Sequence, residues 1–110
     1  MKIEAEGFET LEVAGDGHLR RVVEFMCPKH GPRFAILSAS EEEYIQAAFA
    51  TDNDLVIECR RGGSGEHFKA VRVTDPESEF FSKEEVGDTF AAYWRGEPDV
   101  PWLTWHRASA

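Results

Sequence analysis

Between residues 33 and 73, apolar and polar residues alternate in four runs, RFAIL, EYIQAAF, DLVIECR and HFKAVRV. A period of two is typical of strands that bury one face. The breaks between the runs, SASEE, TDND and GGSG, are short and polar or rich in glycine, which indicates hairpin turns. The composition of EYIQAAF favours a helix, but its close neighbours leave room only for hairpin loops. The segment therefore predicts a four-stranded antiparallel meander.

The pattern changes to a helical period on both sides of this meander. In DGHLRRVVEFMCP an apolar stripe recurs at helical spacing, and we expect Asp16 to cap the helix and Pro28 to end it. The stripe consists of Leu19, Val22, Val23, Met26 and Cys27. The second helix has stronger signals: Ser82 followed by Glu85 is a capping box, and Phe81 with Val86 can form a hydrophobic staple. Its apolar stripe is Val86, Phe90, Tyr93 and Trp94, and Gly96 and Pro98 follow it.

The two ends of the chain predict further strands. Residues 2–13 alternate around Gly7, which suggests one bent strand or a short hairpin. The segment WLTWHR, residues 102–107, follows a proline-containing connector and suggests a closing strand, in which Trp102 and Trp105 would face opposite sides. One indole would then be a core anchor and the other partly exposed.

Together these elements predict one α+β domain over residues 1–110, in the order β-α-β-β-β-β-α-β. We expect an antiparallel sheet, a meander of about four to six strands, with both helices packed on one face. The chain has 110 residues and is 42% hydrophobic, enough for a core without disulfides or metal. The first residues, MKIEAEGF, contain no apolar run for a signal peptide or membrane span. With two cysteines in apolar surroundings, this favours a cytoplasmic protein with reduced thiols.

The charge is strongly acidic, with 21 Asp and Glu against 12 Lys and Arg and a net charge of −9. Nucleic acids and anionic membranes require basic surfaces, so neither is expected as a direct ligand. The acidic residues concentrate in two segments, 41–54 and 75–88. They can be solvated loops that keep the protein in solution, or a surface that binds a basic partner.

Catalytic and metal-binding patterns are weak. Cys27 and His30 have half of a zinc-site spacing, but Cys59 and His67 are eight apart on predicted strands. Neither thiol has surroundings expected of a nucleophile, and the histidines have no Ser or Asp spaced for a triad. We therefore predict no catalytic residue, no bound metal and no cofactor. A small metalloprotein built on these four side chains remains an alternative.

Four stretches in the second half of the chain resemble a known protein family. The stretches YIQAAF (44–49), DLVIECRRG (54–62), EEVGDTFAAYWRG (84–96) and PWLTW (101–105) resemble the small immunity proteins of bacterial polymorphic toxin systems, most closely the first-numbered immunity family. The similarity covers about residues 33–107 and consists of the apolar pattern and several aromatic positions. It implies a non-enzymatic cytosolic protein that binds a cognate toxin domain and occludes its active site.

Nuclease and deaminase toxins have basic substrate clefts, which an acidic inhibitor would complement. We expect the acidic side chains to contact Lys and Arg of the toxin, with Tyr44 or Trp102 as an apolar anchor. The expected contact residues are Glu41, Glu42, Glu43, Tyr44, Asp52, Asp54, Glu77, Glu79 and Trp102. A chaperone-like or regulatory adaptor that uses the same surface is an alternative.

Overall fold

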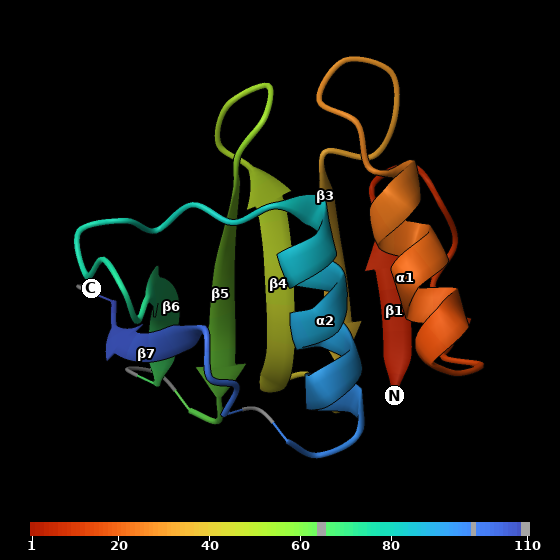
Figure 1. Cartoon of the computed structure of the whole chain (residues 1–110). Coiled ribbons are helices and arrows are strands. Elements are labelled where there is room, and N and C mark those ends of the chain that lie inside the picture. Colours follow the sequence, from red (N-terminus) through yellow and green to blue (C-terminus); the bar gives the residue numbers. More distant parts are fainter. Residues whose placement is uncertain (64–65, 98, 109–110) are drawn as a thin grey trace.

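The computed structural model describes residues 1–63, 66–97 and 99–108 and shows an α+β fold (Figure 1). Its elements are β1 (Lys2–Ala5), β2 (Leu11–Glu12), α1 (Asp16–Phe25), β3 (Phe34–Ser38), β4 (Glu43–Phe49), β5 (Leu55–Arg61), β6 (His67–Arg72), α2 (Lys83–Trp94) and β7 (Leu103–Arg107). The strands form one sheet in the order β2-β1-β3-β4-β5-β6-β7, and every neighbouring pair is antiparallel.

The predicted meander is confirmed as β3 to β6, including β4, whose composition favours a helix. Residues 2–13 form a hairpin, so the sheet gains a short second strand and has seven strands, more than the predicted four to six. Ser64 and Gly65 of the predicted GGSG turn, and Pro98 after α2, lie outside the described residues.

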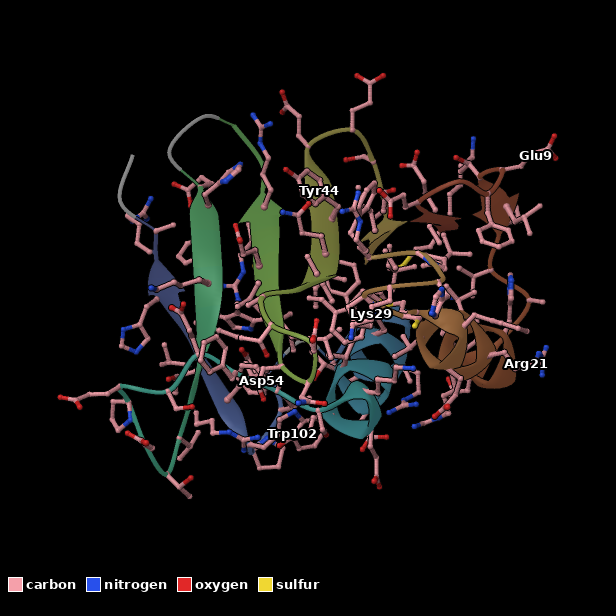
Figure 2. All side chains as sticks on the ribbon, turned by 90° about the horizontal axis from the view of Figure 1, so that it is seen from above. Glu9, Arg21, Lys29, Tyr44, Asp54 and Trp102 are labelled. Atoms are coloured by element: carbon pink, nitrogen blue, oxygen red, sulfur yellow. The ribbon has the colours of Figure 1, made fainter. Side chains whose placement is uncertain are left out.

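Both helices lie on one face of the sheet, as predicted (Figures 1 and 2). Alternate strand residues point toward the helices and are buried, because on this side the sheet packs against the apolar faces of both helices. The strands contribute Ile3, Ala35, Leu37, Ile45, Ala47, Ile57 and Cys59 to the core, and the helices contribute Leu19, Val23, Val86 and Phe90. The opposite side, which we call the open face, carries no helix.

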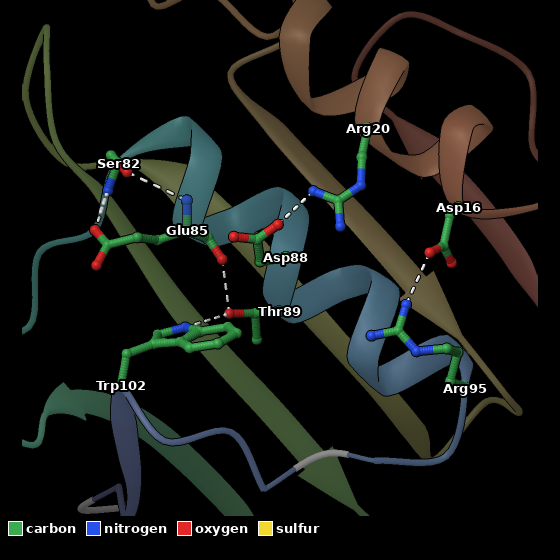
Figure 3. A network of polar contacts seen from close by, with 8 residues as sticks. All are labelled: Asp16, Arg20, Ser82, Glu85, Asp88, Thr89, Arg95 and Trp102. Atoms are coloured by element: carbon green, nitrogen blue, oxygen red, sulfur yellow. Dashed lines mark hydrogen bonds and ion pairs between the residues drawn. The ribbon is translucent and has the colours of Figure 1, made fainter.

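The first helix differs from the prediction at its start. Gly15, rather than Asp16, occupies the N-cap position, with a φ of 155° that favours glycine and no side-chain cap. Asp16 is the first helical residue, and its carboxylate accepts a hydrogen bond from Arg95, the C-cap residue of α2, at 2.8 Å (Figure 3). A second ion pair joins Arg20 of α1 to Asp88 of α2. Asp16 therefore connects two helices instead of capping one.

The first helix also ends earlier than predicted. Its last residue is Phe25, and Met26 is already extended. Cys27, which we expected to be buried in the helix, is half-buried in the following loop. That loop closes on itself, since the Cys27 N–H donates to the Pro32 carbonyl and the Gly31 N–H donates to the Cys27 carbonyl. A Cβ at Gly31 would lie 2.7 Å from the Phe25 carbonyl oxygen, so the closure requires glycine.

The second helix begins as predicted. The Ser82 hydroxyl accepts a hydrogen bond from the Glu85 N–H at 3.2 Å, and the Glu85 carboxylate accepts one from the Ser82 N–H at 2.9 Å (Figure 3). The same carboxylate oxygen accepts a hydrogen bond from the guanidinium of Arg72 in β6 at 2.5 Å. Phe81 is 1% exposed and pairs through its main chain with Leu55 of β5. The capping box thus also ties the start of α2 to the sheet.

The closing strand does not place its tryptophans on opposite faces. Trp102 precedes β7, so strand alternation does not apply to it, and its indole N–H donates to the Thr89 hydroxyl of α2 at 3.0 Å. Trp105 faces the helix-covered side through its pairing with Ala70. Both indoles are half-buried against the same core, and neither is a free aromatic surface.

We predict that Ser82→Ala lowers the free energy of unfolding by about 1 kcal/mol, because it removes the side-chain acceptor of the capping box. Urea denaturation measures the difference. Ser78→Ala is the matched control, since Ser78 uses its main chain for the hydrogen bonds with Arg72 and Asp75; it should change stability by less than about 0.5 kcal/mol. Equal losses in the two variants would contradict this role of Ser82.

Candidate binding surface

The turn between β3 and β4 presents three consecutive carboxylates, Glu41, Glu42 and Glu43, which we call the acidic turn. All three residues are exposed. Among the described residues, none of these carboxylates forms an ion pair with a Lys or Arg side chain. The nearest basic residue in the strand pairing is Arg61, which lies opposite Glu43 in β5 without forming an ion pair with it.

The backbone of the acidic turn is fixed by hydrogen bonds. The Glu43 carbonyl accepts from the N–H groups of Ala39 and Ser40 at 2.8 and 3.2 Å. The Glu42 carbonyl accepts from the Gly62 N–H at 2.8 Å, which ties the turn to the end of β5. A fixed backbone reduces the entropy that the segment would lose when a partner binds.

The other predicted acidic residues lie at the opposite end of the sheet. The strand β4, which begins at Glu43 and ends at Phe49, separates the acidic turn from Asp52 and Asp54, a distance of roughly 20 Å at the rise of a β-strand. Asp52 pairs with Lys29 at 3.7 Å. The Asp54 carboxylate accepts a hydrogen bond from the Thr51 hydroxyl at 3.1 Å, within its own turn.

In the segment before α2, Glu79 pairs with Lys69 of β6 at 2.8 Å, and Glu77 is exposed. The nine predicted contact residues therefore do not form one surface. A sequence pattern cannot show this division, because residues 41–54 are continuous along the chain while their two ends are separated by a full strand.

The two predicted aromatic anchors lie on opposite sides of the sheet (Figure 2). Tyr44 is half-buried on the open face beside the acidic turn, with its ring edge-on to His67 at a centroid distance of 6.4 Å. Trp102 lies on the helix side, where its indole reaches Thr89, whose hydroxyl in turn donates to the Glu85 carbonyl at 2.7 Å. Trp102 thus connects β7 to α2, while Tyr44 stays next to the exposed carboxylates.

The field of the acidic turn reaches the helix side of the sheet. Burial raises the pKa of Tyr93, and the negative charge of Glu43 raises it further, to about 12. The nearby Arg61 acts in the opposite direction but does not cancel these effects. The pKa of Tyr93 therefore reports the charge at Glu43.

A second surface feature was missed by the sequence analysis. An apolar cavity of about 150 Å³ opens between the β1–β2 hairpin and α1. Its lining includes three large side chains that are unusually exposed, Phe8 (65%), Leu11 (53%) and Phe25 (72%). The available signal was weak: Phe25 lies off the apolar stripe of its helix, and Phe8 and Leu11 lie among glutamates.

The cysteines and histidines do not gather into a site. Among the described residues, no group of three or more His, Cys, Asp or Glu side chains could hold a metal ion. Backbone N–H groups of Lys29 and His30 lower the pKa of the Cys27 thiol, whereas burial raises that of Cys59. The two thiols thus lie in different environments, one in the loop after α1 and the other in β5.

Comparisons with protein-family models, with curated proteins and with solved structures found no match to this chain. Within the described ranges, neither helix is both long and apolar enough to span a membrane.

We predict that Tyr93 ionises with a pKa of about 12 and that Glu43→Gln lowers this pKa, because it removes a negative charge that disfavours the phenolate. Since folding raises the pKa of Tyr93, its contribution to the free energy of unfolding is constant below about pH 10, the unfolded value, and falls as the pH rises toward the folded value. Spectrophotometric titration of tyrosinate in a Tyr44→Phe background isolates Tyr93. Glu77→Gln, at the other end of the sheet, should leave the pKa unchanged; an equal effect would exclude a local field.

Proposed function

We propose that this chain is a non-catalytic inhibitor that binds a basic protein domain, a cognate bacterial toxin, and occludes its active site. The observation that carries the proposal is the acidic turn, whose three exposed carboxylates form no ion pair with the described residues and whose backbone is fixed by hydrogen bonds. The resemblance to immunity proteins supplies the class of partner, a nuclease or deaminase domain with a basic cleft.

The physical basis of binding is charge complementarity. A net charge of −9 attracts a basic domain from a distance and raises the rate of encounter. The three carboxylates of the acidic turn then provide the close contacts, where opposite charges fix register and disfavour wrong partners. Because no conformational change is needed to expose them, association can be fast.

Some of the residues predicted to contact the toxin already interact with other side chains of this chain, and others do not. Asp52, Glu79 and Trp102 are bound to Lys29, Lys69 and Thr89, so their interactions with a partner would compete with interactions that hold the fold. Among the described residues, the side chains of the acidic turn and Tyr44 form no ion pair that a partner would have to replace. They also adjoin one another in sequence and on the sheet. The proposed binding surface is therefore the acidic turn with Tyr44 on the open face.

We predict that the combined change Glu41→Lys, Glu42→Lys and Glu43→Lys lowers the association rate constant for the toxin domain by about tenfold or more and reduces its dependence on salt. Each exposed substitution should alter stability by less than about 0.5 kcal/mol. The product of the neighbouring gene is co-expressed with this chain and tested for copurification. Stopped-flow fluorescence at several salt concentrations then measures association.

The matched control makes Glu24→Lys, Glu77→Lys and Glu84→Lys, three exposed residues away from the acidic turn. It changes the net charge by the same amount, so it separates the effect of this turn from that of total charge. Equal slowing by both triple variants would show that the acidic turn has no special role. Unchanged toxin neutralisation by the acidic-turn variant would exclude the turn as the binding surface.

A further inference from the structure

The apolar cavity between the β1–β2 hairpin and α1 has the size of one large side chain. Its volume of about 150 Å³ is similar to that of an engineered protein cavity that stays dry and binds benzene. Its floor is formed by Ile3, Ala5 and Pro32, which are buried. Phe8, Leu11, Val22 and Phe25 complete the apolar lining. The cavity therefore suits a phenylalanine or leucine side chain.

The carboxylate that lines the cavity is that of Glu9 on the hairpin, and His18 of α1 lines it as well. Glu12 pairs with Lys2 in the hairpin, alternates with the cavity-lining Leu11, and forms an ion pair with the N-terminal amine at 3.4 Å. Glu12 and Glu41 also line a second, more polar hollow between the N-terminus and the β3–β4 turn. On the helix side, the Arg21 guanidinium folds back over Gly17, toward the first turn of α1. The apolar cavity and this polar hollow share no lining residue, and Glu9 is the carboxylate next to the apolar lining.

The exposed apolar area is too small for a stable dimer on its own. The exposed parts of Phe8, Leu11 and Phe25 amount to roughly 400 Å², the size of the largest patch on many monomers. A standard interface buries about 800 Å² on each partner. A single inserted side chain from a larger partner explains the size of the patch better than a second copy of this chain.

We propose that the partner inserts one large apolar side chain, flanked by lysine or arginine, into the cavity between the β1–β2 hairpin and α1. The ring or isobutyl group fills the cavity, and a flanking cation meets the carboxylate of Glu9. Such an anchor in an apolar pocket, beside charged contacts, is the usual form of a binding hot spot. That the partner is a basic protein rests on the proposed function, whereas the capacity of the cavity to bind an apolar side chain does not.

Peptide probes test the inference without the toxin. The first probe is a pentapeptide with phenylalanine between two pairs of lysines and both ends blocked. Titrated into the full ¹⁵N-labelled chain, it should shift the amide signals of Phe8, Leu11 and Val22, with a dissociation constant in the millimolar range. Two control peptides replace the phenylalanine by serine or all four lysines by glutamate. Each control should bind about tenfold more weakly or not at all.

Variants locate the site. Phe8→Ser combined with Phe25→Ser removes two exposed side chains that line the cavity. The double variant should bind the peptide with phenylalanine between lysines about tenfold more weakly. Phe80→Ser is the matched control, since Phe80 is also exposed (39%) but lies in the segment before α2. Val22→Phe fills the cavity from within and should also abolish binding, which keeps the test valid if the double variant unfolds.

Three results would overturn the inference: equal binding of the serine peptide, shifts away from the cavity, or a dimer in sedimentation experiments that Phe25→Ser dissociates. The last result would assign the patch to a second copy of this chain. Failure here differs from failure of the proposed function. If toxin binding depends on the acidic turn but not on the cavity, the proposed function stands and the inference about the cavity fails. If the peptide binds the cavity but no toxin binds the chain, the inference stands and the proposed function fails.

Discussion

The fold depends on the packing of α2 against the middle of the sheet. Val86 and Phe90 are fully buried there, and removal of either would leave a cavity that costs several kcal/mol. Polar contacts then extend from α2 in three directions. Figure 3 shows Arg20 to Asp88 and Arg95 to Asp16 toward α1, and Trp102 to Thr89 toward β7. The third direction is toward β6, through Arg72 to Glu85. One buried helix thus sets the positions of the first helix and the last strand.

This arrangement decides which surfaces are free. Because α1 and α2 share one face, the open face and the turns at both ends of the sheet remain available. Most carboxylates near the helices are used in ion pairs, while those of the acidic turn are not. The short helix α1 leaves the β1–β2 hairpin incompletely covered, which produces the apolar cavity. The two proposed contact regions therefore follow from where the helices end.

Local patterns predicted most of the fold. The alternation of residues 33–73 and the pairing of Ser82 with Glu85 depend on neighbours in sequence, so both appear in the structure. The candidate surface was less predictable, because ion pairs such as Asp52 with Lys29 join segments that are distant in sequence. Alternation was also extended to Trp102, one residue before the strand begins. The cavity required three separate segments to meet, for which no sequence pattern exists.

The order of the strands has a consequence for folding. Every pairing from β3 to β6 joins neighbours in the chain, whereas Ala5 pairs with Ala35 and Arg72 pairs with Leu103, each across an intervening helix. Contacts between distant residues require closure of long loops and form slowly. The meander can therefore assemble as a nucleus before the outer strands attach. Amide exchange should be slowest in β4 and β5, while β2 and β7 open locally without unfolding of the centre.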